Sequence, residues 1–261
     1  MNTDLTGQHA LVCGSTQGIG KATALELARL GASITLLARD AQALEAVRAE
    51  LSVKAEQQHR ILVCDMTDTE GLRNAVGAHV ADQRIDIVVN NTGGPAPGPA
   101  HEAGTAAFLA AFTQHLVAFQ TIVRAVVPGM KERRHGRIIN VISTSVKQPL
   151  PNLGVSNTIR GAVANWGKTL ATELGPFNIT VNNVLPGATE TERLAAIIAN
   201  KAQKTGAAKE EVKHEMLAEI PLRRFARPEE IAGAVAFLAG PAGAYINGIN
   251  LPVDGGRTAC L

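Results

Sequence analysis

The chain has 261 residues and a formal net charge of +2, from 25 lysines and arginines against 23 aspartates and glutamates. This length suits one α/β domain with a large core, and so balanced a charge gives no reason to expect a nucleic acid or an anionic membrane as partner. No apolar run is long enough to span a bilayer, and the N-terminus lacks a basic region followed by an apolar one, so we expect a cytoplasmic protein. Three cysteines are an odd number, and they indicate neither a disulfide nor a metal site.

A glycine-rich turn lies between a strand-like and a helix-like pattern near the N-terminus. Residues 10–12 predict a buried strand, and residues 21–30 carry apolar side chains at helical spacing before Gly31. Glycines let the backbone turn tightly and approach a pyrophosphate, and a helix N-terminus offers it free N–H groups. The pattern therefore predicts a phosphate cradle, with an ordinary glycine-rich turn as the alternative. The predicted cradle residues are Gly14, Ser15, Thr16, Gln17, Gly18, Ile19 and Gly20.

Strand-like and helix-like patterns continue to alternate along the chain. Strands are predicted at residues 34–37, 61–64, 85–90, 137–143, 178–184 and near 250, which with the first strand makes seven. Helices are predicted after Asp40 and at residues 70–80, 108–130 (ending near Pro128), 155–174 and from Pro228. This alternation predicts a single Rossmann-type domain over residues 1–261. Its sheet is doubly wound and mainly parallel, with helices on both faces.

The end of the second predicted strand indicates which dinucleotide is bound. An acidic residue there would bind the ribose hydroxyls of NAD, but the sequence has Ala38 followed by Arg39. A guanidinium can pair with the 2′-phosphate of NADP, which a carboxylate would repel. NADP(H) is therefore favoured and NAD(H) stays possible, with Arg39 as an ordinary surface arginine the alternative.

The cradle spacing, GxxxGxG, resembles the TGxxxGIG motif of the short-chain dehydrogenase/reductase family, with Cys13 in place of the threonine. Residues 90–93 resemble the family's NNAG, residues 136–143 its GRIVNISS, and residues 247–256 its TGQxLxVDGG, so the resemblance spans nearly the whole chain. In general pattern it is similar to the family's 3-oxoacyl-carrier-protein reductases. The resemblance implies hydride transfer between the nicotinamide cofactor and a carbonyl or alcohol. It also implies cofactor contacts at Asp65, Met66, Asn91, Thr92, Gly93, Arg160, Pro186, Gly187, Thr189 and Thr191.

Three of the four catalytic positions of the family carry other residues here. Ser143 matches the serine that hydrogen-bonds the substrate carbonyl, whereas His115, Ser156 and Arg160 stand in place of asparagine, tyrosine and lysine. The i, i+4 spacing still places the last two on one helix face. An aliphatic hydroxyl is a much weaker acid than a phenol with a pKa of about 10, and arginine does not give up a proton. The proton would come from water, from His115 or from the substrate. The single tyrosine, Tyr245, lies too far along the chain to replace the family's tyrosine.

Two functions follow from this pattern. The first is an NADP(H)-dependent oxidoreductase with a non-standard active site, in which a helical flap at about residues 188–225 covers a small-molecule substrate. The alternative is a catalytically impaired nucleotide-binding protein that acts as a sensor or partner subunit. The helices at residues 108–130 and 155–174 resemble the family's interface helices, which implies a homo-oligomer, expected to be a tetramer.

Overall fold

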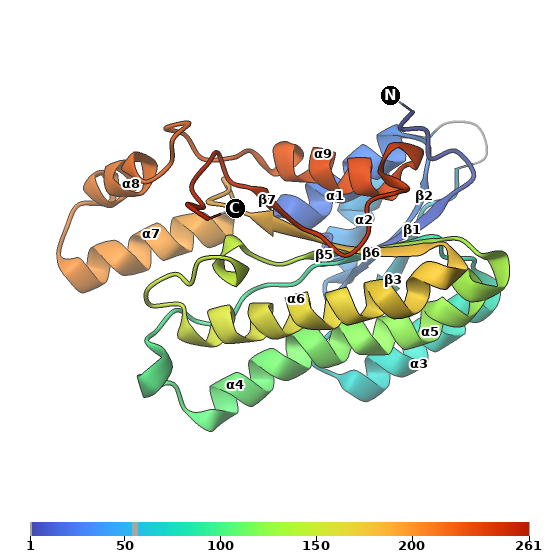
Figure 1. The fold of residues 1–261 in the computed structure, drawn as a ribbon, viewed down its shortest axis with the longest axis horizontal. Helices are drawn as coiled ribbons and strands as arrows, with labels where there is room; N and C mark the ends of the chain where they lie inside the picture. Colours follow the sequence, from blue (N-terminus) through green and yellow to red (C-terminus); the bar gives the residue numbers. More distant parts are fainter. Residues whose placement is uncertain (1, 54–56, 261) are drawn as a thin grey trace.

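The computed structural model describes residues 2–53 and 57–260. Its centre is a seven-stranded sheet in the order β3-β2-β1-β4-β5-β6-β7, in which neighbouring strands pair in parallel (Figure 1). The strands are β1 (His9–Cys13), β2 (Ser33–Ala38), β3 (Arg60–Val63), β4 (Ile87–Asn90), β5 (Gly136–Val141), β6 (Ile179–Pro186) and β7 (Asn250–Val253). The predicted Rossmann-type, doubly wound sheet is confirmed.

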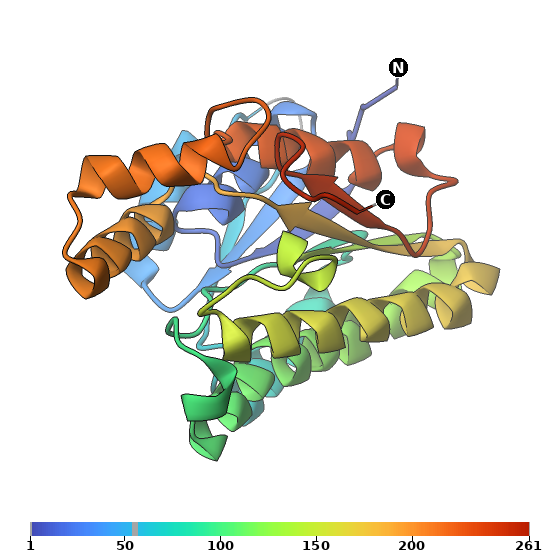
Figure 2. The same ribbon diagram turned by 60° about the vertical axis from the view of Figure 1, so that its left-hand side comes forward.

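Helices cover both faces of the sheet, and two further helices project beyond one end of it (Figures 1 and 2). One face is covered by α1 (Gly18–Arg29), α2 (Ala41–Glu50) and α9 (Pro228–Ala239). The other is covered by α3 (Thr69–Asp82), α5 (Ala118–Arg133) and α6 (Gly154–Leu174). The remaining long helices are α4 (Thr105–Phe112), which leads into α5, and the projecting pair α7 (Glu192–Thr205) and α8 (Lys209–Ala218). Short 3-10 helices occupy Ala100–Glu102, Thr144–Val146, Gly175–Phe177 and Pro241–Gly243.

Each face of the sheet has its own hydrophobic core. Successive side chains of a strand point to opposite faces, so the neighbours Leu11 and Val12 in β1 belong to different clusters. Leu11 packs in the cluster that includes Ile122 of α5, and Val12 packs in the one that includes Leu27 of α1. Both strand residues are fully buried. Continuous apolar strands are what a sheet covered on both faces requires.

The helix predicted at residues 108–130 is longer than expected and does not end at Pro128. α4 continues through a π-helical turn (Thr113–Val117) into α5, which runs to Arg133 and stops where Arg134 adopts a left-handed conformation. Proline removes one helical hydrogen bond, but the buried Val126 and Met130 hold the helix against the sheet on either side of it.

This continuous helix also corrects the expectation that no apolar run could span a bilayer. Thr105–Arg133 has 29 residues, and its most apolar window has a mean hydropathy of 1.5 with 33% of the window buried. By length and composition alone it is long and apolar enough to cross a membrane. In the fold, α5 buries Phe119, Ile122 and Val126 against the sheet. A largely apolar helix is found in a protein core as well as in a membrane.

A row of asparagines crosses the sheet from β4 to β7. In the parallel register Asn90 pairs with Asn140, Asn140 with Asn183, and Asn183 with Asn250. Each side-chain amide donates to the next carbonyl oxygen in this order, at 2.8, 2.9 and 2.8 Å. A Cβ on Gly167 of α6 would lie only 2.9 Å from the Asn183 Oδ1 atom, so the helix packs closely on the row. Because buried amides need hydrogen-bond partners, the row favours this one register among the four strands.

Candidate functional site

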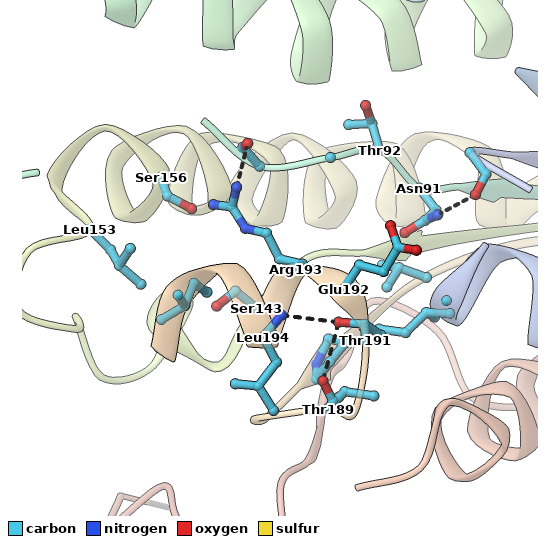
Figure 3. A pocket seen from close by; sticks show the side chains of 18 of the residues that line it. Asn91, Thr92, Ser143, Leu153, Ser156, Thr189, Thr191, Glu192, Arg193 and Leu194 are labelled. Atoms are coloured by element: carbon cyan, nitrogen blue, oxygen red, sulfur yellow. Dashed lines mark hydrogen bonds between the residues drawn. The ribbon is translucent and has the colours of Figure 1, made fainter. Parts of the chain in front are cut away.

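A cavity of about 970 Å³ lies where the carboxyl ends of the strands meet (Figure 3). The strand order reverses between β1 and β4, and ligands of doubly wound sheets bind in the crevice outside such a point. The loops after β1 to β6 line the cavity, and α7 closes one side of it. The cavity is large enough for a dinucleotide end and a small substrate together.

The turn after β1 forms the cradle that the sequence predicts. Gly14 and Gly18 have φ of +59° and +54°, and a Cβ on Gly14 would lie 2.8 Å from the backbone oxygen of Asn91. The Asn91 Nδ2 atom donates to the carbonyl oxygens of Cys13 and Gly14, at 3.2 and 3.3 Å, and so holds the turn in shape. Gln17 makes no side-chain capping bond to α1 in the described structure, so the first N–H groups of the helix are available to an anion. The residues fit a dinucleotide pyrophosphate.

The loop after β2, the strand next to β1, carries a cation where the adenosine ribose would lie. The Arg39 side chain is 76% exposed, and its Nη1 atom lies 3.7 Å from Asp65 Oδ2. The other carboxylate oxygen of Asp65 accepts from the Thr67 amide and hydroxyl, both at 2.8 Å. The Thr67 amide is the largest cause that lowers the pKa of Asp65, ahead of Arg39. Asp65 is thus held by Thr67, and Arg39 extends into solvent at the cavity rim, where it can meet a phosphate.

Most of the predicted cofactor residues line this one cavity. Two cradle residues do not: Ser15 is buried and its hydroxyl lies 3.4 Å from the Leu37 carbonyl oxygen, and Gly20 packs against the Gly14 carbonyl, which a Cβ would strike. Ser15 and Gly20 therefore shape the turn and do not face the cavity. The residues that do line the cavity are Gly14, Thr16, Gln17, Gly18, Ile19, Arg39, Asp65, Met66, Asn91, Thr92, Gly93, Arg160, Pro186, Gly187, Thr189 and Thr191.

Two threonines shape the chain where it leaves β6 for the flap. Thr191 is the N-cap of α7: its hydroxyl oxygen accepts from the Leu194 amide at 3.3 Å and donates to the Thr189 carbonyl oxygen at 3.2 Å (Figure 3). The Thr189 hydroxyl donates to the Gly187 carbonyl oxygen at 3.1 Å. The Thr191 methyl group lies 3.2 Å from the position of a Cβ on Gly18. The flap helix therefore begins directly against the phosphate cradle.

Three of the four catalytic candidates, Ser143, Ser156 and Arg160, line the cavity, and Figure 3 shows the two serines there. Ser143 follows β5; its oxygen accepts from the Ser145 amide at 3.1 Å, which leaves its hydroxyl proton to donate. Ser156 and Arg160 face the cavity from α6. Arg160 is 7% exposed and donates from Nη1 to the Val141 carbonyl oxygen at 3.0 Å. Burial lowers its pKa to about 10, so it stays charged at neutral pH.

His115 lies outside the lining of the cavity. It is fully buried in the π-helical turn, and its Nδ1 atom donates to the Ala111 carbonyl oxygen at 2.9 Å. With Nδ1 protonated, Nε2 carries no proton, and burial followed by the charge of Arg160 lowers the pKa of the ring to about 3. A neutral imidazole with its one proton committed to a carbonyl has none to give. This geometry counts against His115 as the proton donor.

Sequence reasoning missed, among others, two lining residues that hydrogen-bond to the loop after β4. Arg193, in the first turn of α7, donates to the carbonyl oxygens of Gly94 and Pro95, at 3.0 and 2.7 Å. Gln114 donates to the Thr92 hydroxyl at 3.1 Å. The position of Arg193 two residues after Thr191 was a usable signal, because the first turn of the flap helix faces the cradle. Tyr245 is fully exposed and does not line the cavity.

Comparisons with known proteins match this chain to reductases and dehydrogenases along nearly its whole length. The family model described as enoyl-(acyl carrier protein) reductase matches residues 14–258. The NADPH-dependent reductase BacG of Bacillus subtilis (strain 168) is 32% identical over 255 residues, which cover 97% of this chain and 98% of that protein. Gluconate 5-dehydrogenase of Gluconobacter oxydans (strain 621H) is 30% identical, over 98% of this chain and 97% of its own.

A solved structure extends the likeness to three dimensions. The L-sorbose reductase of Gluconobacter frateurii, crystallised with NADPH and L-sorbose, superposes with a TM-score of 0.92 at 30% identity, and the match covers all of both chains.

Proposed function

The chain belongs to the short-chain dehydrogenase/reductase family, as its sequence motifs predict, and from that premise we propose that it is an NADP(H)-dependent oxidoreductase acting on a carbonyl or alcohol. The observation that carries the proposal is that the Ser143 hydroxyl and the phosphate cradle open onto one cavity. Relatives named as NADPH-dependent, and solved with NADPH, support the choice of cofactor. Arg39 at the cavity rim supports it independently.

The chain's own residues would hold the dinucleotide in three parts. The cradle turn and the N-terminus of α1 would bind the pyrophosphate. Arg39 would pair with the 2′-phosphate, while Asp65 and Met66 would contact the adenine. The nicotinamide half would be held by Asn91, Thr92, Gly93, Arg160, Pro186, Gly187, Thr189 and Thr191, all of which line the cavity.

The substrate end would act by charge and position rather than by a strong acid. The bound nicotinamide would supply a hydride to the carbonyl carbon. Ser143 would donate its hydroxyl proton in a hydrogen bond to the carbonyl oxygen, onto which the C=O electron pair moves. The Arg160 charge, fixed in a buried setting, would stabilise the negative charge that develops there. Water in the cavity would then protonate the oxygen, because Ser156 is too weak an acid and Arg160 keeps its proton.

A non-catalytic function is the alternative, and the replacement of tyrosine by Ser156 and of lysine by Arg160 favours it. General acid–base catalysis is typically worth ~100- to 10,000-fold, so an enzyme without it should be slow on ordinary ketones. Both functions require NADPH binding. Only the first requires turnover.

A panel of ketones, oxo acids and aldehydes, followed by NADPH absorbance, tests the proposal. We expect slow oxidation of NADPH with at least one carbonyl. Ser143→Ala should lower kcat about 100-fold, as the loss of an oxyanion donor does, while Ser156→Ala should change it only a few-fold. Firm NADPH binding without turnover would favour the sensor or partner subunit. Equal losses in the two serine variants would refute the roles given to them.

We also propose that the protein is a homotetramer. A cytoplasmic location and a single domain remain predictions from the sequence. Leu109 and Phe112 on α4 are 63% and 40% exposed, and such apolar side chains beside the packed helices α5 and α6 suit a subunit interface. A stable monomer by light scattering at micromolar concentration would overturn the assembly.

A further inference from the structure

Two guanidinium groups from different elements meet at the substrate end of the cavity. Arg160 reaches it from the buried face of α6, and Arg193 reaches it from the first turn of α7. A Cβ on Gly94 would lie 3.0 Å from Arg193 Nη2 and 3.8 Å from Arg160 Nη2, so both groups border the same small space. Figure 3 shows the Arg193 side chain extending from α7 into the cavity, which Ser143 and Ser156 also line.

Neither guanidinium is neutralised by an acid in the described part of the chain. Within the described residues, Arg193 donates to the carbonyl oxygens of Gly94 and Pro95, and Arg160 donates to that of Val141. The Arg160 Nε atom is buried without a hydrogen-bond partner. Carbonyl oxygens satisfy hydrogen-bond donors but cancel no charge, so the two positive charges remain.

Two other cations that line the cavity, by contrast, are paired with acids. At its rim Arg257 pairs with Glu219 at 2.5 Å, and Lys201 pairs with Glu215 at 2.8 Å. Glu192, next to Arg193 in the chain, is exposed, and no ion pair joins the two in the described residues. Acids thus neutralise Arg257 and Lys201 at the rim, whereas no ion pair in the described residues neutralises Arg160 or Arg193 at the centre.

The two central charges repel each other at short range. After burial, the charge of Arg193 is the cause that lowers the pKa of Arg160. Like charges held this close in a partly desolvated site cost free energy, which an anion placed between them would recover. The site is therefore complementary to a negative group on whatever binds beside Ser143.

We propose, on the basis of the oxidoreductase function above, that the substrate is a carbonyl compound bearing a carboxylate, which Arg193 and Arg160 bind while Ser143 holds the carbonyl oxygen. A guanidinium presents parallel N–H groups that match the two oxygens of a carboxylate. Arg193 keeps further N–H hydrogens after its two bonds to the loop. Because it stands on the flap helix, the bound carboxylate would also tie α7 to the catalytic face and help exclude water.

A second anion could meet Arg193, namely the pyrophosphate of the cofactor, and the experiment separates the two. Calorimetry on the protein saturated with NADP⁺ would compare pyruvate, acetoacetate and levulinate with their methyl esters, and needs no turnover. We expect each acid to bind about 10- to 100-fold more tightly than its ester. Arg193→Gln should remove most of this preference and leave the Kd for NADP⁺ within about two-fold.

Lys213→Gln is the matched control, because it removes one positive charge from an exposed position on α8 of the same flap. It should keep the full preference for the acids. Equal binding of acids and esters to the unmutated protein would overturn the proposal. So would an Arg193→Gln variant that loses NADP⁺ affinity but keeps its preference for acids, since Arg193 would then serve the pyrophosphate. Arg193-dependent binding of an acid without turnover of any oxo acid would support the anion site and sink the proposed hydride transfer.

Discussion

The two ends of the cavity are built from different parts of the chain. The nucleotide end is made largely of backbone: a turn with two left-handed glycines and the free N–H groups of α1. The substrate end is made of side chains, with Ser143, Ser156, Arg160 and Arg193 converging from three elements. A backbone site changes only if the turn itself changes, whereas a side chain can be replaced on an unaltered scaffold. This difference supports the proposed active site, in which the cradle and the sheet follow the family's pattern and the side chains at three predicted catalytic positions differ from it.

The sharpest test of the comparison is Gly14→Ala. A Cβ there would lie 2.8 Å from the Asn91 oxygen and 2.9 Å from its amide nitrogen, at a φ of +59° that alanine rarely adopts. The turn would have to move, so we expect NADPH affinity to fall more than ~100-fold and stability to fall by about 1–3 kcal/mol. Fluorescence titration with NADPH and urea unfolding measure the two effects.

Gly77→Ala is the control for this change. Gly77 lies within α3, and a Cβ there would meet nothing within 4 Å. Alanine should stabilise that helix by about 0.5–1 kcal/mol and leave NADPH binding unchanged. If Gly14→Ala bound NADPH as well as the Gly77→Ala protein does, the cradle would not be the backbone-dictated site described above.

The backbone-dictated features are also those that the sequence predicts well. The cradle turn and the parallel sheet implied by the alternation follow from local rules. So does Asp40 as the N-cap of α2, where its carboxylate accepts from the Ala43 amide at 3.0 Å. Local rules failed at Pro128, because the packing of α5 on the sheet outweighs the lost hydrogen bond. Which side chains converge depends on tertiary placement.

At the substrate end, local rules also fail to predict which side chains meet. Sequence position suggested His115 as a candidate proton donor, and nothing local reveals that its ring faces the core and donates to Ala111. Arg193 was overlooked because its position two residues after Thr191 places it only in the first turn of the flap helix, whereas its contact with the loop at Gly94 depends on how the flap folds. Chemistry that depends on which side chains meet is visible only in three dimensions.

His115 offers a test of whether the substrate end kept a titrating acid. Burial lowers its folded-state pKa to about 3, below its ordinary value of 6.5. Between these values the unfolded chain binds the extra proton, so its contribution to stability is complete above pH 6.5 and is lost as the pH falls, by up to about 1.4 kcal/mol per pH unit. Urea unfolding from pH 7 to pH 4 should show a shallower pH dependence for His115→Gln than for the unmutated protein.

The same variant bears on catalysis. Because His115 stays neutral through the neutral range, its removal should leave the shape of the pH–rate profile between pH 6 and pH 8 unchanged, whatever it does to the overall rate. A group titrating near neutrality that disappears in His115→Gln would restore the histidine as an acid, and equal pH dependences of unfolding would show that its pKa is not lowered.

The smallest effect is expected at Arg39, the charged side chain proposed to pair with the 2′-phosphate. Arg39 is 76% exposed and pairs with Asp65 at 3.7 Å, so water and salt screen its charge. Arg39→Ala should therefore weaken NADPH binding by only about 10-fold at low salt, and less at high salt, while NADH binding stays nearly unchanged. Arg73→Ala on α3 removes a comparably exposed arginine and should alter neither. Equal losses for the two cofactors would remove Arg39 from the 2′-phosphate site, and the choice between NADP(H) and NAD(H) would then have to be made by the backbone as well.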